Sequence, residues 1–302
     1  MGTHLGKTLR FHRKQAGMSR EKLAEDICAP STLWRIEEGH TMPSKRNLNL
    51  LFQKLGLNPD SFNTIWISNE EAEIQKLTDA LDRHLVSRSV DEATKVITTL
   101  ENNEKFMKDK LNEKHIFLAK AANMINMNEE VPLIFESLIK AIHIAPNKFC
   151  EDDIEKYPLT KTDFAALNLM ATQYFALGEQ ERAVRILYGL KRNVENICVD
   201  DIERGKRYPT VIFNLTKYLS IMGKHDEVMK LCDEGKAVCL ATRYLRLVPD
   251  ILFNKVYSLF ANGDVVEGEK LLRDVYHTLC LFDRHKEAQL AKNYADELGI
   301  VL

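Results

Sequence analysis

The sequence predicts an all-α protein in which a small N-terminal domain of short helices precedes a long right-handed helical solenoid. Apolar residues recur at helical spacing along nearly the whole chain, and no segment shows the alternating pattern of a strand. In the second half, Gly178, Gly223 and Gly263 separate helical segments at intervals of 45 and 40 residues. Self-similarity at such intervals is typical of stacked helix pairs.

The composition is that of an ordinary globular protein, with 45% hydrophobic and 28% charged residues. No stretch approaches the roughly 20 apolar residues of a membrane-spanning helix, and the first residues lack the apolar core of a signal peptide. We therefore expect a cytoplasmic protein without membrane contact. The sequence contains no P-loop, G-x-S-x-G, H-E-x-x-H or Gly-rich dinucleotide motif, so we expect neither a cofactor nor enzyme activity.

The six cysteines form no C-x-x-C pair and have no histidine at metal-ligand spacing. They are Cys28, Cys150, Cys198, Cys232, Cys239 and Cys280. We interpret them as buried free thiols of a reducing compartment, not as metal ligands. The acidic residues at 151–155 are interpreted as a solvated helix start rather than a metal or catalytic site.

Charge is distributed unevenly, although the net charge of the whole chain is only −2. Residues 1–60 contain ten Lys/Arg and six Asp/Glu, a net charge of +4. The remainder carries 32 Lys/Arg and 38 Asp/Glu, a net charge of −6. A basic head on an acidic body indicates that only the head meets a polyanion.

Four short amphipathic helices are predicted in the head, over residues 5–15, 20–27, 31–38 and 45–55. Glycines suited to C-terminal caps follow three of them: Gly17, Gly39 and Gly56. Ser19 is an N-cap candidate for the second helix, and Pro43-Ser44 opens the fourth. Ala24 lets the second and third helices cross closely, as in a helix-turn-helix, whose second helix lies in a DNA major groove.

Two segments of the head resemble the Cro/C1-type (XRE) helix-turn-helix family. They are MSREKLAE at residues 18–25 and LWRIEEG at residues 33–39. The intervening segment Ile27-Cys28-Ala29-Pro30-Ser31 resembles the compressed turn of Rgg- and PrgX-like regulators.

By position, five residues at the start of the third helix are candidates to face the groove: Pro30, Ser31, Thr32, Trp34 and Arg35. Three cations near helix starts are candidates for phosphate contacts: Arg20, Lys45 and Arg46. Alternatives remain open for three of these residues. In these alternatives, Arg35 pairs with Glu38, Trp34 belongs to the core, and Ser31 only caps its helix.

Helical repeats are predicted in the second half of the chain, around the three glycines. Each glycine has a tyrosine four to six residues before it and a small or branched residue five after it: Tyr174, Tyr218 and Tyr257, then Ala183, Val228 and Gly268. The pattern resembles tetratricopeptide (TPR) repeats, whose period is about 34 residues. Weaker copies are expected at residues 89–93 and 123–131. We predict about five helix pairs and a capping helix over residues 284–298, with a concave groove lined by the first helix of each pair.

Asparagines recur at equivalent positions in the first helices of these repeats. Asn214 and Asn254 lie nine residues before their glycines, and Asn168 lies ten before its own. A row of carboxamides can donate to and accept from an extended peptide backbone, and Lys217, one turn beyond Asn214, can hold a carboxylate. The alternative is that these asparagines face solvent or bond across helices.

The combination of an XRE head and about five such repeats resembles the RRNPP family (Rgg-, PlcR- and PrgX-like) of Gram-positive quorum-sensing regulators. The resemblance implies a homodimer that binds promoter DNA, an inverted repeat in our prediction, and whose repeat domain binds a short signalling peptide. It predicts a DNA-binding domain at residues 1–60, a linker at 61–69 and a sensing and dimerising repeat domain at 70–302. The alternative is a repeat domain that binds a protein partner rather than a peptide.

Overall fold

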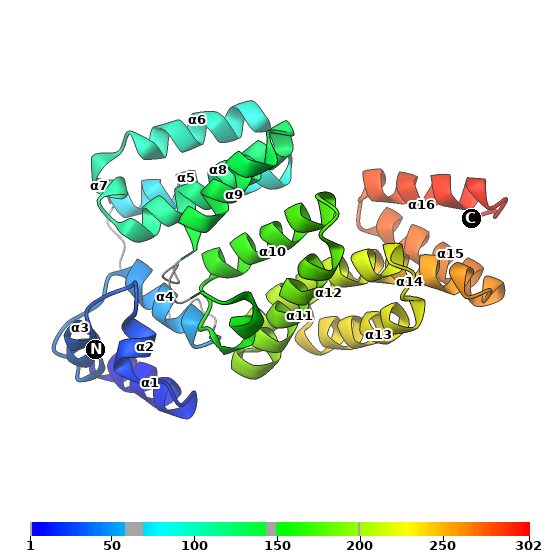
Figure 1. Ribbon diagram of the computed structural model, residues 1–302. Helices are drawn as coiled ribbons and strands as arrows, with labels where there is room; N and C mark the ends of the chain where they lie inside the picture. Colours follow the sequence, from blue (N-terminus) through cyan, green and yellow to red (C-terminus); the bar gives the residue numbers. More distant parts are fainter. Residues whose placement is uncertain (1, 58–68, 143–148, 199) are drawn as a thin grey trace.

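Every regular element in the described part of the chain is a helix. The computed structural model describes residues 2–57, 69–142, 149–198 and 200–302, and its elements run in order from the N-terminal head to the C-terminal repeats (Figure 1). The predicted all-α fold is confirmed. The predicted linker at residues 61–69 lies outside the described residues, except for Asn69 at the start of a helix.

The head consists of α1 (Gly2–Gln15), α2 (Arg20–Ala24), α3 (Pro30–Glu37) and α4 (Lys45–Lys54). Ser19 caps α2 as predicted, and Ser44 caps α4 in the same way. Ser19 Oγ accepts a hydrogen bond from the Lys22 amide at 3.1 Å, and Ser44 Oγ accepts one from the Asn47 amide at 3.1 Å. Gly17 after α1 has a φ of +63°, a conformation that glycine adopts without steric cost.

Helix α2 ends at Ala24, three residues before the predicted end at Ile27. A side chain from another helix accounts for this early end. Lys54 of α4 donates from Nζ to the Glu25 carbonyl at 2.5 Å, and Asp26 takes a left-handed φ of +61°. Since Lys54 lies 29 residues along the chain, no local pattern indicates this stop.

One compact core holds the four helices of the head together. Its fully buried members come from all four helices and include Leu9, Leu23, Leu33, Leu48 and Phe52. Ala24 is also fully buried, as expected where α2 crosses α3. Removing a buried leucine from such a core costs about 2–5 kcal/mol, so the head depends on these side chains.

The repeat domain contains five helix pairs within the described residues, followed by one last helix. The pairs are α5 (Asn69–Val86) with α6 (Val90–Glu101), α8 (Lys110–Met127) with α9 (Val131–Ala141), α10 (Lys161–Ala176) with α11 (Gln180–Ile197), α12 (Asp201–Ile221) with α13 (His225–Thr242), and α14 (Val248–Ala261) with α15 (Val265–Leu281). A short α7 (Glu104–Met107) and a 3₁₀ helix η2 (Glu151–Lys156) stand between pairs, and α16 (His285–Glu297) ends the array. The predicted number of pairs and the capping helix agree with the structure.

Glycine turns mark the helix pairs for a local reason. Gly178, Gly223 and Gly263 have φ values of +84°, +75° and +84°. A Cβ at any of the three would meet no atom within 4 Å, so backbone conformation rather than space requires glycine there. Ala183 and Val228 on the following helices are fully buried, which allows each pair to pack closely.

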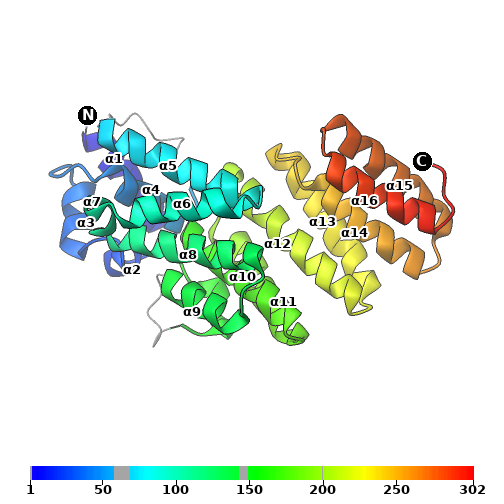
Figure 2. The same cartoon turned by 90° about the horizontal axis from the view of Figure 1, so that it is seen from above.

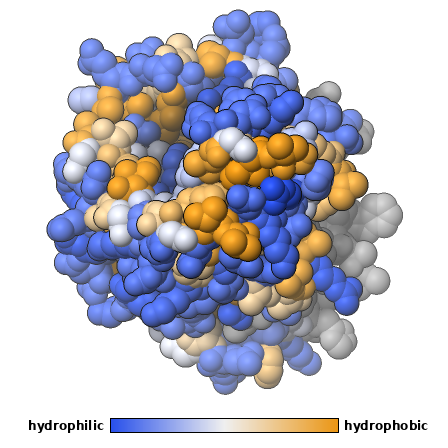
Figure 3. All heavy atoms as spheres, turned by 90° about the vertical axis from the view of Figure 1, so that its right-hand side faces the viewer, coloured by the Kyte–Doolittle hydropathy of each residue, from blue (hydrophilic) through white to orange (hydrophobic). Residues whose placement is uncertain are grey.

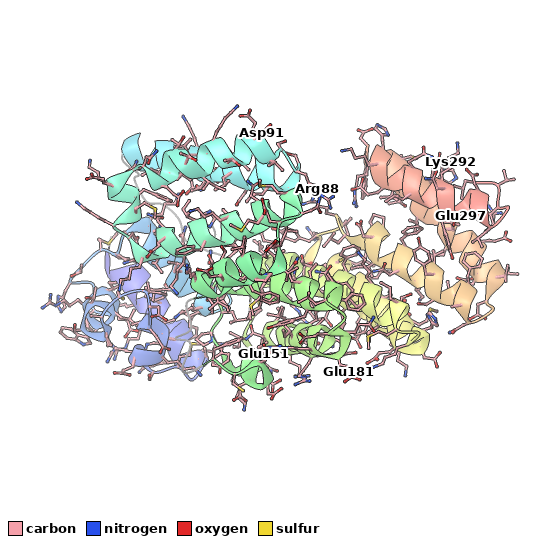
Figure 4. All side chains as sticks on the ribbon, turned by 45° about the horizontal axis from the view of Figure 1, so that its top comes forward. Arg88, Asp91, Glu151, Glu181, Lys292 and Glu297 are labelled. Atoms are coloured by element: carbon pink, nitrogen blue, oxygen red, sulfur yellow. The ribbon has the colours of Figure 1, made fainter. Side chains whose placement is uncertain are left out.

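The solenoid curves so that its first and last parts face each other across an open side. The helices α10, α12 and α14 lie toward this opening, between α6 and α16, while α11, α13 and α15 lie on the outer side (Figures 1 and 2). Figure 4 shows Arg88 on one side of the opening and Lys292 and Glu297 of α16 on the other, with Glu151 and Glu181 at the outer edge. The first helices of the last three pairs therefore line the inner surface.

The head is docked on the repeat domain through the end of α4. Ile197 at the end of α11 packs against the core of the head, and the Asp200 amide donates to the Gly56 carbonyl at 3.0 Å. A Cβ on Gly56 would lie 2.4 Å from the Ile197 carbonyl oxygen, so only glycine permits this approach. Among the residues that the structure describes, no helix combines the length and the apolar character needed to cross a membrane.

Candidate functional site

Helix α3 presents an exposed face at the end of the molecule formed by the head. Pro30, Ser31 and Arg35 are exposed, and Thr32 is half-buried. Trp34 is 43% exposed, and its ring lies 5.6 Å from that of His40. The alternative in which Trp34 belongs to the core is therefore wrong. The five candidates for groove contacts lie on one short helix, with Leu33 and Ile36 anchoring its other face in the core.

Two further alternatives for this helix are also wrong. Ser31 does not cap α3, because the N-cap is Ala29 and Pro30 occupies the first helical position. Arg35 does not pair with Glu38. Glu38 instead accepts a hydrogen bond from Arg10 Nη1 of α1 at 2.5 Å. No ion pair of Arg35 is found within the described residues. The hydroxyl of Ser31 and the guanidinium of Arg35 are thus directed away from the packing of the head.

Glu37 organises the charges behind this face, a role that the sequence prediction missed. Its side chain is fully buried and accepts hydrogen bonds from Arg13 Nη2 at 3.0 Å and Arg20 Nε at 2.8 Å. Burial alone raises the pKa of Glu37, but the hydrogen bonds and charges of the two arginines outweigh it, and the net pKa lies below the usual value. The signal available was the position of Glu37 inside the apolar periodicity of α3.

The three predicted phosphate-binding cations occupy different environments. Arg20 is bound to Glu37, and its side chain remains 31% exposed at the head surface. Lys45 and Arg46, at the start of α4, line a cavity between the head and the repeat domain. Arg46 Nε lies 3.4 Å from Asp109 Oδ2 of the repeat domain, and burial lowers the pKa of Arg46 to about 10. The prediction that Arg46 contacts a DNA phosphate is therefore corrected, because the Arg46 side chain faces the repeat domain.

The inner surface of the repeat domain brings two of the predicted asparagines together. Asn214 of α12 donates from Nδ2 to Asn168 Oδ1 of α10 at 3.0 Å, and both side chains are partly exposed. Lys217 lies on the same helix as Asn214 and is exposed. Since this bond uses one N–H of Asn214, the second N–H and the remaining oxygen lone pairs of the pair are available for a further partner.

The third asparagine differs, and the prediction of peptide contact for Asn254 is corrected. Asn254 is 7% exposed, and its Nδ2 donates to the Phe213 carbonyl at 3.0 Å and to Thr216 Oγ1 at 2.9 Å. A carboxamide nitrogen has two N–H groups, so both are used within the packing of α14 against α12. This is the alternative of a bond across helices, and the bond from Asn214 of α12 to Asn168 of α10 is also of that kind.

Aromatic rings accompany the asparagines along the inner helices. Phe175 of α10 stacks on Tyr218 of α12 with ring centroids 4.0 Å apart. Tyr257 of α14, which is 37% exposed, lies 4.3 Å from Tyr294 of α16. In the sequence, Tyr218 and Tyr257 stand out only as markers of the repeats. Tyr218 is buried, with only 4% of its surface exposed, so of these two rings only Tyr257 presents a surface on the inner side.

The remaining candidates have structural roles. Glu151 accepts two hydrogen bonds of 2.9 Å from Arg182, whose guanidinium carbon lies 3.9 Å from the centre of the Tyr174 ring. All six cysteines are free, but only Cys232 and Cys239 are buried; Cys28, Cys198 and Cys280 are half-buried, and the prediction of burial is wrong for the exposed Cys150. Burial raises the pKa of the Cys232 thiol to about 12 and that of Cys239 to about 11, so both remain protonated at neutral pH.

Comparison with known proteins identifies the head and the fold. Residues 9–62 match the model of the family described as helix-turn-helix (HTH_3). No match to the chain was found among the curated protein sequences. Solved structures match over nearly the whole length.

Two of these structures contain both a peptide and DNA. The crystal structure of Bacillus thuringiensis PlcR in complex with the peptide PapR7 and DNA is 15% identical, with a TM-score of 0.59, and covers 96% of this chain and 99% of that one. ComR from S. thermophilus, in complex with DNA and its signalling peptide ComS, is 15% identical, with a TM-score of 0.51, and covers 98% of this chain and 100% of that one. TPR-like repeats of a kinesin light chain from Podosopora anserina match 72% of this chain at 15% identity and a TM-score of 0.50. The chain therefore has a helix-turn-helix head followed by TPR-like repeats.

Proposed function

Because residues 9–62 belong to the helix-turn-helix family and the whole chain has the fold of PlcR and ComR, we propose that this protein is a DNA-binding transcriptional regulator controlled by a short signalling peptide. The observation that carries the proposal is the exposed face of α3. Elsewhere in the head, Arg10, Arg13 and Arg20 form ion pairs with acidic residues of the head itself. The proposal places the protein in the cytoplasm with its DNA. It assigns domains to residues 1–60 and 70–302, joined by a linker at 61–69.

The DNA contacts are assigned to α3. Its exposed N-terminal residues, Pro30, Ser31 and Thr32, approach base edges or phosphates, and Arg35 reads a guanine or binds the backbone. Trp34 covers the sugar-phosphate backbone with its exposed ring. Arg13 and Glu37 set the angle of α3 by tying it to α1, and Arg20 lies beside them at the surface. Binding of this kind weakens as salt rises, since bound phosphates release counterions.

The peptide is assigned to the inner surface of the repeat domain. Asn168 and Asn214 bind the peptide backbone, because their linked carboxamides keep free donor and acceptor positions. Lys217 holds a carboxylate of the peptide. The partly exposed ring of Tyr257 takes an apolar side chain. Asn254 supports this surface from behind by fixing α14 to α12.

The homodimer is assigned to the C-terminal end of the solenoid. Figure 3 shows apolar residues gathered on this face of the molecule. Five large apolar side chains of α15, α16 and the residues beside them are exposed by 46% to 85%: Val266, Leu281, Phe282, Leu290 and Val301. Apolar surface of this kind marks an interaction site. Two heads in such a dimer would place their α3 helices about 34–36 Å apart, or a multiple of that, on an inverted repeat.

A change of solenoid curvature is the proposed link between peptide and DNA. A peptide that binds one curvature better than another shifts the population toward it, and the spacing of the two heads changes with it. The experiment is a fluorescence anisotropy titration of the protein with its own promoter fragment at two salt concentrations. Binding that weakens with salt, and that changes when a peptide encoded next to the gene is added, supports the proposal. If no peptide changes the affinity for the promoter fragment, and the repeat domain captures a folded protein, the partner is a protein instead.

A further inference from the structure

A cavity of about 510 Å³ lies between the head and the repeat domain, away from both surfaces described above. Its walls come from α4, from α5, from α7 with the start of α8, and from the start of α10. The two ribbon views agree that α4 lies beside α5 and α7 (Figures 1 and 2). Ligand sites of soluble proteins have volumes of about 300–1,000 Å³ and often lie between domains. This cavity therefore has the size and the place of a ligand site.

Three buried polar atoms on the walls of this cavity have no hydrogen-bond partner in the described part of the chain. They are Arg46 Nε, Asn49 Oδ1 and His115 Nε2. Arg46 Nε does lie 3.4 Å from Asp109 Oδ2, but that contact lacks hydrogen-bond geometry. Native proteins satisfy nearly all buried polar groups. Three such atoms on one cavity, from both domains, indicate that a bound molecule supplies the missing partners.

The polarity of the three atoms restricts the chemistry of that molecule. Arg46 Nε–H can only donate, so it needs an acceptor, and Asn49 Oδ1 can only accept, so it needs a donor. Burial lowers the pKa of His115, so its ring is neutral at pH 7 and offers either one donor or one acceptor at Nε2. The ligand must carry donors and acceptors within the reach of two α4 side chains one turn apart.

Charge around the cavity is mixed, so its walls favour neither a bare anion nor a bare cation. Lys45 and Lys161 stand on its walls, but so do Asp79 and Asp82. Lys161 Nζ lies 3.6 Å from Asp82 Oδ2 across the opening. A bare anion would be repelled by the aspartates on the walls. A bare cation would be repelled by Arg46 and the lysines. A zwitterion satisfies both sets.

Apolar side chains supply the remaining wall of the cavity. Ile74 of α5 lines it with a half-buried side chain, and the buried side chains of Leu50 of α4 and Phe106 of α7 lie behind the wall, 9% and 2% exposed. We propose that the cavity binds a free α-amino acid with an apolar side chain, whose carboxylate accepts from Arg46 Nε and whose ammonium donates to Asn49 Oδ1. The apolar side chain lies against Ile74, with Leu50 and Phe106 behind it, and His115 Nε2 completes the polar contacts. The amino acid bridges the head and the repeat domain.

The test is isothermal titration calorimetry of the full-length protein with leucine, isoleucine, phenylalanine, glycine and inorganic phosphate, one at a time. The proposal predicts saturable binding of an apolar amino acid, weaker binding of glycine and none of phosphate. Asn49→Leu removes the acceptor, and His115→Phe removes the ring nitrogen at similar volume. Each variant should weaken binding by at least about tenfold. Asn102→Leu, the same change at an exposed asparagine outside the cavity, should bind as the natural chain does.

Three results would overturn the proposal. They are no heat from any amino acid at millimolar concentration, binding of phosphate in preference to amino acids, and unchanged affinity in both Asn49→Leu and His115→Phe. Circular dichroism of each variant shows whether it folds, and the two variants alter different domains, so a folding defect in one leaves the other informative. DNA binding and peptide binding do not enter this test, so it stands apart from the proposed function.

Discussion

Glu37 and Arg13 lie 24 residues apart in sequence and form a buried ion pair that joins α3 to α1. Arg20 of α2 binds the same carboxylate, so three of the four head helices meet at one charged group. Arg13 also donates from Nη1 to the Met18 carbonyl at 2.8 Å. This cluster fixes the orientation of the helix that carries the exposed residues Ser31, Trp34 and Arg35.

Glu37→Gln should therefore destabilise the head. The substitution leaves the Arg13 guanidinium buried without a counter-charge, and breaking a buried pair in this way costs about 3–5 kcal/mol. The free energy of unfolding, measured by urea denaturation with circular dichroism, reports the loss. Glu38→Gln is the matched control, because the Arg10–Glu38 pair is exposed at both ends and should contribute at most about 1 kcal/mol. Equal losses in the two variants would contradict the role given to Glu37.

Gly56→Ala should loosen the contact between the head and the repeat domain. A Cβ there would overlap the Ile197 carbonyl oxygen at 2.4 Å, and the φ of +71° is unfavourable for alanine. Hydrogen exchange of the Asp200 amide, which donates to the Gly56 carbonyl, should become faster. Gly178→Ala is the control. Its φ of +84° strains an alanine in the same way as at Gly56, but no atom lies within 4 Å of the new Cβ. If both variants leave the Asp200 amide equally protected, the docking contact is not what requires glycine.

Arg35→Ala should weaken promoter binding without affecting stability. Arg35 is exposed and has no ion pair within the described residues, and loss of a base contact costs about 1–3 kcal/mol. Anisotropy titrations with promoter DNA and with a scrambled duplex separate the two roles of Arg35. A loss confined to the promoter indicates a base contact, and an equal loss on both duplexes indicates a phosphate contact. Promoter affinity equal to that of the natural chain would remove α3 from the DNA interface.

Asn214→Ala and Asn254→Ala should have opposite profiles. Asn214→Ala removes a partly exposed carboxamide, so peptide affinity should fall by about tenfold or more while the free energy of unfolding changes little. Asn254→Ala leaves Thr216 and the Phe213 carbonyl without their buried partner, which costs about 1–3 kcal/mol of stability. Calorimetric peptide titration and urea denaturation of both variants provide the comparison. A peptide site that is unchanged in Asn214→Ala would refute the assignment of this residue.

Leu281→Glu should convert the proposed dimer to a monomer. Leu281 is 81% exposed at the C-terminal end of the solenoid, so a charge there costs the folded monomer little but disfavours burial in an interface. Size-exclusion chromatography with light scattering measures the mass. Leu177→Glu, at another exposed leucine with 52% exposure in the α10–α11 turn, is the control and should remain dimeric. A natural chain that is already monomeric at high concentration would contradict the assigned interface.

Local features of this fold follow from the sequence, and long-range ones do not. Gly178, Gly223 and Gly263 revealed the helix pairs because a left-handed backbone favours glycine wherever it occurs. The capping roles of Ser19 and Ser44 are equally local. The inward turn of Asn254 depends instead on a carbonyl 41 residues away, and spacing from a glycine carries no information about that partner.

The predicted site shows the same division. The groove candidates of α3 were predicted from their position at its start, and the structure turns Leu33 and Ile36 inward and leaves Ser31, Trp34 and Arg35 exposed. Arg46 was misplaced because its environment is set by Asp109 of the repeat domain, and no pattern within the first sixty residues describes how the head is docked. Glu37 escaped notice because a carboxylate is usually a surface group, and only the two arginines that meet it allow its burial.

The central claim is that peptide binding in the repeat domain alters DNA binding by the head. It is tested most directly by measuring the affinity of the full-length protein for its own promoter fragment with and without the peptide encoded next to its gene, in the natural chain and in Asn214→Ala. We predict that the peptide changes the affinity of the natural chain by about tenfold or more and that Asn214→Ala binds the promoter but loses this response. Identical promoter affinity with and without peptide, under conditions in which calorimetry shows the peptide bound, would contradict the account.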